Sequence, residues 1–217
     1  MIRWISGIAL GFLFLAYILL SPSFFFKFGL IIIFGTSIYE LIKLRVFSLQ
    51  SLLAFFLIVT AILCLYSYDL ERSLILVAVM ISVVTDAFAF FTGKVLGRNK
   101  IFPIISPNKT LEGTLSGVFV PSILLLLFTL TLSEYQFLYS FLELSPMIDS
   151  WGIANTFLAL VFCSLMSIAG DLFASKAKRT IAIKDFGNLL PGHGGILDRI
   201  DSHLVCIPIF FFLNSLI

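Results

Sequence analysis

The chain has 217 residues, of which 60% are hydrophobic and only 12% are charged. A water-soluble domain carries about 25% charged residues, so a fold whose whole surface faces water is excluded and lipid must cover much of this protein. The net charge of +2 is too small to indicate a nucleic-acid partner, and we expect none. The cysteines lie inside apolar runs without paired spacing, which favours buried apolar residues over a metal or disulfide role: Cys64, Cys163 and Cys206.

Seven apolar runs have about the 17–25 residues that a membrane-spanning helix needs. They cover residues 4–20, 24–42, 51–67, 73–92, 114–132, 153–170 and 203–217. No small-residue cleavage site follows the first run, so we interpret it as a retained anchor helix rather than a signal peptide. Because a span in lipid must satisfy its backbone hydrogen bonds internally, the sequence predicts an all-α transmembrane bundle. We expect residues 1–217 to form a single integral membrane domain.

The basic residues predict the orientation of this bundle. If the amino terminus lies in the cytoplasm, twelve of the fourteen Lys and Arg residues fall on the cytoplasmic side. Only Lys27 and Arg72 fall on the other side. This distribution obeys the positive-inside rule in every loop. We therefore predict a multi-pass protein of about seven spans with a cytoplasmic amino terminus.

Two predicted cytoplasmic loops, residues 93–113 and 170–202, carry more polar chemistry than a connector needs. The second interleaves five cations and a glycine-rich turn with four carboxylates, Asp171, Asp185, Asp198 and Asp201. Carboxylates suit Mg²⁺, cations neutralise a polyphosphate, and glycines let the backbone approach an anion. The combination predicts a metal-assisted phosphoryl or nucleotidyl transfer site. The alternative is that these charges only follow topology and pair with one another in solvent.

Single residues outside that loop add to this prediction. Asp86 lies within the fourth apolar run, where an ionisable group costs about 2.5–3.5 kcal/mol. We expect it to face a cavity shared with the two loops, with a hydrogen bond to a neighbouring helix as the alternative. Glu40, near the inner end of the second run, is explained by pairing with Lys43 or by reaching the membrane interface. His193 between two glycines favours a phosphate contact over a general base.

The first loop contains a turn at Ser106-Pro107-Asn108. Asn108 or Thr110 could cap the helix that begins the fifth span. Lys109 has no such structural explanation, and it would bring a further cation to the same side of the membrane.

The motifs of the second loop resemble those of a known family. Ser175-Lys176-Ala177-Lys178-Arg179, Lys184-Asp185 and the run from Pro191-Gly192-His193-Gly194-Gly195 to Asp198-Arg199-Ile200-Asp201 resemble the signature of phosphatidate cytidylyltransferases, the CDP-diacylglycerol synthases. Asp86 and the 93–113 loop are similar to that family's second recognisable block, and residues 3–40 to its amino-terminal pair of helices. The resemblance implies an enzyme in which the phosphate of phosphatidic acid attacks the α-phosphorus of CTP, giving CDP-diacylglycerol and pyrophosphate.

The resemblance, together with the charge pattern, assigns roles to individual residues. The catalytic residues would be Asp171, Asp198, Lys184 and Asp185. The substrate-binding residues would be Ser106, Lys109, Ser175, Lys178, Arg179, His193, Gly194 and Arg199. The metal ligands would be Asp171, Asp198, Asp201 and Asp86. The implied cofactors are Mg²⁺ and a second, monovalent cation such as K⁺. The implied partners are CTP, phosphatidic acid and the lipid bilayer of the inner (cytoplasmic) membrane, and a homodimer is among the assemblies it allows.

The chain departs from this family between the amino-terminal helices and the Asp86 helix. Family members commonly have more spans there, whereas this chain has about one, residues 51–67. The difference bears on the lipid groove and on a dimer interface. Two other functions remain open: a CTP-dependent transferase or kinase acting on another membrane lipid, such as an isoprenoid or ether lipid, and a transporter subunit. Transporter sites usually lie near the bilayer midplane, whereas these carboxylates cluster at one membrane face.

Overall fold

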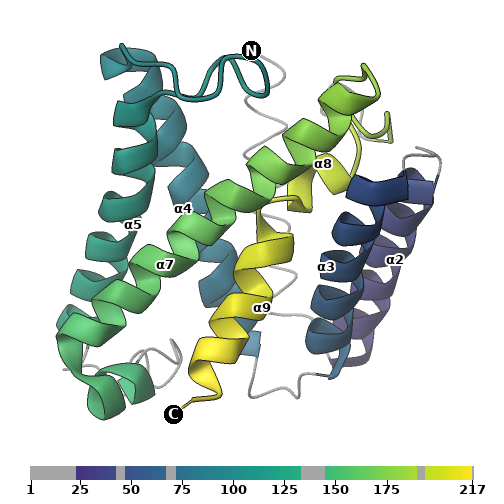
Figure 1. Cartoon of the computed structure of the whole chain (residues 1–217). Coiled ribbons are helices and arrows are strands. Elements are labelled where there is room, and N and C mark those ends of the chain that lie inside the picture. Colours follow the sequence, from purple (N-terminus) through teal and green to yellow (C-terminus); the bar gives the residue numbers. More distant parts are fainter. Residues whose placement is uncertain (1–22, 43–46, 67–71, 133–144, 190–193, 217) are drawn as a thin grey trace. The chain divides into compact units, whose positions relative to one another are not determined.

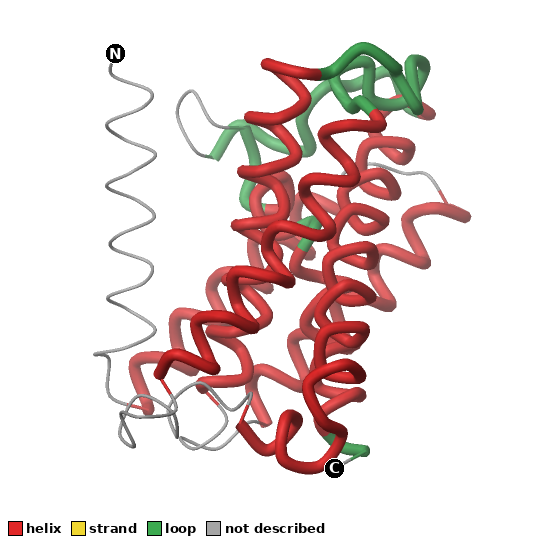
Figure 2. The backbone as a smooth tube through the Cα atoms, turned by 90° about the vertical axis from the view of Figure 1, so that its left-hand side faces the viewer, coloured by secondary structure: helices red, strands yellow, loops and turns green. Residues whose placement is uncertain are grey.

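The computed structural model describes residues 23–42, 47–66, 72–132, 145–189 and 194–216. Helices and loops account for this part of the chain, and Figure 2 shows no strand in it. An isolated antiparallel bridge joins Lys100 and Thr110. The predicted all-α class is confirmed.

The described helices follow the apolar runs of the sequence. They are α2 (Ser23–Ile42), α3 (Phe47–Tyr66), α4 (Arg72–Leu96), α5 (Leu111–Leu132), α7 (Ser145–Thr180), α8 (Leu197–Ile200) and α9 (His203–Asn214). Four contain apolar stretches long enough to cross a bilayer, namely Phe24–Ile42, Leu74–Leu96, Leu111–Thr131 and Met147–Thr180. Two shorter apolar stretches, Leu53–Leu65 and His203–Asn214, match the third and seventh predicted runs. The predicted span 4–20 lies outside the described residues, and the cytoplasmic amino terminus stays a prediction.

Helix α7 is much longer than the predicted run 153–170. A kink at Gly152 separates its first turns from the rest of the helix, and the φ of +77° at this residue favours glycine. At its other end the helix continues to Thr180, so residues 170–180, which we expected to begin a loop, are helical. Asp171, Ser175 and Lys178 are therefore spaced by four and three residues along one helix, and they share a face.

The chain divides into two compact units. One comprises residues 1–72 and 185–199, and the other comprises residues 73–184 and 200–217. In the first unit α2 packs on α3, and the two helices lie side by side in Figure 1. In the second unit α7 packs against both α5 and α9.

Glycines bring α4 and α5 of the second unit into direct backbone contact. A Cβ added at Gly113 would lie 2.5 Å from the Ala89 carbonyl oxygen and 3.0 Å from the Cα of Gly93. A Cβ at Gly117 would lie 2.8 Å from the Thr85 carbonyl oxygen. Only glycine fits at these positions without a backbone shift, and the close approach fixes the start of α5 beside the helix that carries Asp86.

We predict that Gly113→Ala destabilises the protein by about 1–3 kcal/mol, because the added methyl group must push two helix backbones apart. The measurement is the thermal unfolding midpoint of the purified protein in detergent. Gly35→Ala is the matched control, since no neighbouring atom lies within 4 Å of a Cβ added to that helical glycine. An unchanged midpoint for Gly113→Ala would contradict the close contact between α4 and α5.

Candidate active site

The carboxylate of Glu112 binds the loop between α4 and α5. It accepts hydrogen bonds from the backbone N–H of Arg98 (3.1 Å) and Asn99 (3.3 Å) and from the side-chain amide of Asn99 (3.1 Å). The Thr110 hydroxyl accepts the Gly113 N–H at 3.2 Å, so Thr110 rather than Asn108 caps the start of α5. These hydrogen bonds attach the loop that carries Lys109 to the start of α5.

Lys109 forms an ion pair with Asp171 of α7. The Nζ–Oδ2 distance is 2.7 Å, and the two side chains are 17% and 29% exposed. Lys109 also donates to the Ile168 carbonyl oxygen at 3.5 Å. The other oxygen of Asp171 accepts the Ser175 hydroxyl at 3.3 Å. The ion pair thus joins the two segments that the sequence marked as active-site loops.

A cavity of about 190 Å³ lies beside this ion pair. It is lined by Asp86, Ala89 and Phe90 of α4, by Asn108, Lys109, Thr110 and Thr114, and by Asp171. The cavity that we expected Asp86 to share with residues of both loops is therefore present. One part of its wall is apolar and the other carries opposite charges.

Asp201 and Lys178 form a second, more buried pair. Their side-chain oxygen and nitrogen lie 3.7 Å apart, and the residues are 7% and 9% exposed. The Ser202 N–H donates to Asp201 at 2.9 Å. Burial and then the negative charge of Asp171 raise the pKa of Asp201 well above 3.8, against the opposing effects of Lys178 and the Ser202 N–H, and Asp86 adds to the rise. Three carboxylates therefore repel one another in this region.

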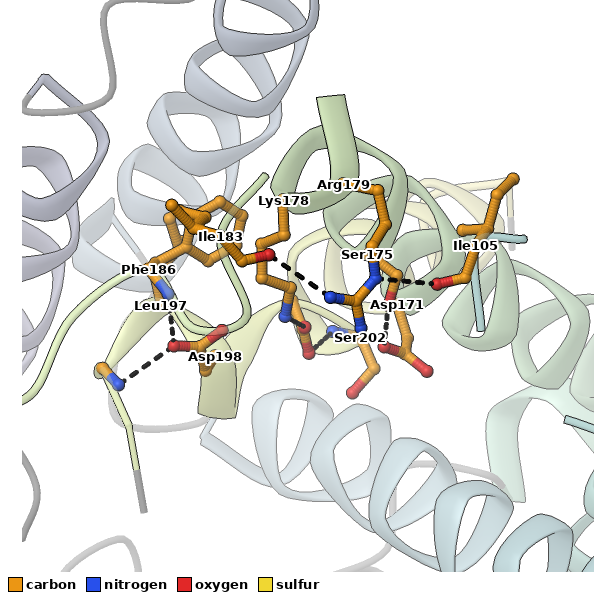
Figure 3. Close-up of polar contacts among 12 residues, drawn as sticks. Ile105, Asp171, Ser175, Lys178, Arg179, Ile183, Phe186, Leu197, Asp198 and Ser202 are labelled. Atoms are coloured by element: carbon orange, nitrogen blue, oxygen red, sulfur yellow. Dashed lines mark hydrogen bonds and ion pairs between the residues drawn. The ribbon is translucent and has the colours of Figure 1, made fainter. Parts of the chain in front are cut away.

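Arg179 connects the first loop to the residues that follow α7. Its Nε donates to the Ile105 carbonyl oxygen at 3.4 Å, and its Nη1 donates to the Ile183 carbonyl oxygen at 3.3 Å. Figure 3 shows the guanidinium between these two residues. The adjacent Ser106 closes a turn through its backbone, because its carbonyl oxygen accepts the Lys109 N–H at 3.2 Å.

In the other unit, Asp198 closes the segment from residue 185 to residue 199. Its Oδ2 accepts the backbone N–H groups of Phe186 (2.8 Å) and Gly195 (3.0 Å), as Figure 3 shows for Phe186. Gly194 has a φ of +81°, and a Cβ there would lie 3.2 Å from the same oxygen. The positive φ and the close carboxylate together explain the glycine at this position.

Glu40 of α2 also binds this segment, and the sequence did not predict that contact. The residue is 3% exposed. Its Oε1 accepts the Ile196 N–H at 3.1 Å and its Oε2 accepts the Leu197 N–H at 2.9 Å. Of the two expected explanations, burial excludes extension to the membrane interface, and Lys43 lies outside the described residues.

Comparison with known proteins is consistent with this arrangement. Residues 8–217 match the model of the cytidylyltransferase family. The chain belongs to this family. It is 41% identical to the phosphatidate cytidylyltransferase of Bacillus subtilis over 132 aligned residues. These residues make up 61% of this chain and 44% of that protein. The protein of the same name from Aquifex aeolicus is 38% identical over 130 residues, covering 60% of this chain and 42% of the relative.

A third relative extends over more of the chain. The phosphatidate cytidylyltransferase of Rickettsia bellii is 35% identical over 161 residues, which cover 73% of this chain and 64% of that protein. The chain therefore matches about two fifths to two thirds of the length of these curated relatives.

Lys184, Asp185 and Arg199 are exposed, and His193 lies outside the described residues. Among the described residues, no group of three or more acidic, His or Cys side chains is placed to hold a metal ion by itself. Mg²⁺ commonly binds through one or two carboxylates and completes its shell with water and substrate phosphates. The metal-binding and catalytic assignments therefore stay predictions.

We predict that Asp201→Asn flattens the pH dependence of stability. Folding raises the pKa of Asp201. At pH values above the ordinary pKa of aspartate, the folded protein therefore keeps a proton on Asp201 that the unfolded chain has released. The stability of the wild-type protein therefore falls as the pH rises. Thermal unfolding with EDTA at pH 5 and pH 8 measures this, and the variant should gain stability over the wild type at pH 8. If the unfolding midpoints of the wild type and the variant differed by the same amount at both pH values, the raised pKa of Asp201 would be contradicted.

Proposed function

We propose that this chain transfers CMP from CTP to phosphatidic acid, forming CDP-diacylglycerol and pyrophosphate in phospholipid biosynthesis. The proposal is supported by family membership and by the name that the relatives share. The structural observation that carries it is the Lys109–Asp171 ion pair at the wall of a cavity that also contains Asp86. Lys109 of the first loop meets carboxylates of two helices there, Asp86 of α4 and Asp171 of α7.

The reaction joins two anionic groups, so the site must supply positive charge. An oxygen of the lipid phosphate forms a bond to the α-phosphorus of CTP while the bond from that phosphorus to the leaving pyrophosphate breaks. A lipid phosphate is already ionised near neutral pH, so no general base is needed. Lys109 and Lys178 are each paired with an aspartate, and each can exchange that partner for a phosphate oxygen.

The acidic residues of this region fit a divalent cation. Burial first, and then the negative charges of Asp171 and Asp86, raise the pKa of Asp201. A positive ion would relieve the repulsion among these carboxylates, whose oxygens are the donors that Mg²⁺ prefers. Asp171 and Asp201 would hold it with Asp86 nearby, and Asp198 is proposed as a further ligand on the resemblance alone. Bound Mg²⁺ would supply charge that stabilises the transition state and the pyrophosphate. The monovalent cation and the homodimer rest on the resemblance.

The cavity also fits a lipid acceptor. Ala89 and Phe90 form its apolar wall, and Phe90 is 54% exposed on the surface of a helix long enough to span a bilayer. An amphipathic substrate could place its phosphate near Lys109 and its acyl chains along this surface. We propose that the protein lies in the inner membrane, where CTP reaches it from the cytoplasm.

The direct test is to incubate the purified chain with α-labelled CTP, Mg²⁺ and a panel of acceptors containing phosphatidic acid, an isoprenoid alcohol, an isoprenoid phosphate and an ether-linked phosphatidic acid analogue. We expect labelled CDP-diacylglycerol and unlabelled pyrophosphate from phosphatidic acid, loss of turnover in EDTA, and recovery on adding Mg²⁺. A labelled product formed only from an isoprenoid acceptor would contradict the proposed substrate.

We predict that Asp171→Asn lowers kcat by about 10²–10³-fold, because the variant loses a charge that holds Lys109 and is proposed to hold the metal. The kinetic assay above measures the effect. Asp149→Asn is the matched control, since Asp149 is an exposed carboxylate near the opposite end of the same helix. Near-wild-type turnover by Asp171→Asn would remove that residue from the active site.

A further inference from the structure

Glu40 is a buried carboxylate that the proposed reaction does not use. It lies near the carboxyl end of α2, where its two oxygens accept the adjacent N–H groups of Ile196 and Leu197. Hydrogen bonds to a charged acceptor are about twice as strong as neutral ones. A carboxylate removed from water also needs such donors to offset its lost hydration. The contact is therefore a strong attachment between α2 and a segment about 156 residues away in sequence.

Two glycines leave space for this carboxylate. A Cβ added at Gly195 would lie 2.5 Å from Oε2 and 2.7 Å from Oε1 of Glu40. At Gly187 the three atoms nearest to an added Cβ also belong to Glu40, with Cδ at 2.8 Å. Any larger residue at either position would push the carboxylate away from its donors. The glycines of this segment thus accommodate an acidic side chain of the same protein.

Three consecutive backbone N–H groups of the segment bind carboxylates. The N–H of Gly195 donates to Asp198, and the next two donate to Glu40. Asp198 is held within the segment, whereas Glu40 attaches the segment to a helix. The position of Asp198 and of the neighbouring Arg199 therefore depends on Glu40.

We propose that Glu40 is a positioning residue, which holds residues 194–199 in the conformation that presents Asp198 and Arg199 to the substrates. This inference rests on the proposed function, because it takes those two residues to act on CTP or the lipid phosphate. Glu40 itself touches no substrate. Helix α2 packs on α3, and its buried residues Phe26, Leu30 and Phe34 lie nearer to its amino end than Glu40.

Glu40→Gln is the first test. The glutamine has nearly the same shape, but it replaces one acceptor oxygen with an NH₂ group that faces a backbone donor, so at least one hydrogen bond is lost. We expect faster hydrogen exchange of the Ile196 and Leu197 amides and a kcat lowered by about tenfold. The KM for CTP should change less, because geometry rather than ground-state binding is affected. Ser37→Ala is the matched control, since Ser37 is buried on the same helix and its hydroxyl bonds the Ile33 carbonyl oxygen of that helix.

A coupling experiment separates positioning from general damage. Gly187→Ala should lower kcat in the wild-type background, because the methyl group meets Glu40. In a Glu40→Ala background the same change should have almost no further effect, since the atoms nearest to the added methyl group are gone. Equal effects of Gly187→Ala in both backgrounds would overturn the proposed contact.

The outcomes distinguish this inference from the proposed function. Unchanged amide exchange at Ile196 and Leu197 in Glu40→Gln would show that the carboxylate does not hold the segment. Faster exchange with wild-type kcat would overturn the positioning role and leave the proposed function intact. Absence of turnover by the wild-type chain would reject the proposed function and the positioning role together, while the exchange data would still test the attachment of the segment.

Discussion

The ion pair between Lys109 and Asp171 is the interaction on which the rest of the site depends. It connects the loop before α5 to the long helix α7, with 2.7 Å between Lys109 Nζ and Asp171 Oδ2. Few charged residues are available in this chain, and those within apolar helices must find partners or a wet cavity. Asp86 meets that requirement by facing the same cavity. A group of opposite charges is thereby concentrated at one place in a protein that is otherwise largely apolar.

The surrounding fold explains why these charges stay in position. Gly93 and Gly113 allow two helix backbones to touch, and this contact fixes the loop that carries Lys109. The continuation of α7 to Thr180 places Asp171 and Lys178 on one rigid helix rather than on a loop. A site built on helices holds its side chains more accurately than one built on loops, which suits a reaction that depends on alignment and charge.

Much of the fold follows from the sequence, because apolar runs of spanning length leave the backbone few alternatives to helix. The helical extension after residue 170 was not predicted, since its dense charges are equally typical of a loop. Arg179 was expected to bind phosphate, but the structure shows its guanidinium on two carbonyl oxygens. The role proposed for Glu40 depends on a contact across about 156 residues, and no local pattern in the sequence encodes such a contact.

The central proposal is that carboxylates of the second unit bind a divalent ion together with nucleotide phosphates. Electron paramagnetic resonance of Mn²⁺, used in place of Mg²⁺, tests it most directly on the purified chain. We predict saturable Mn²⁺ binding that becomes tighter when CTP is added and is strongly weakened in Asp171→Asn. Equal Mn²⁺ binding by the two proteins in the presence of CTP would contradict the account.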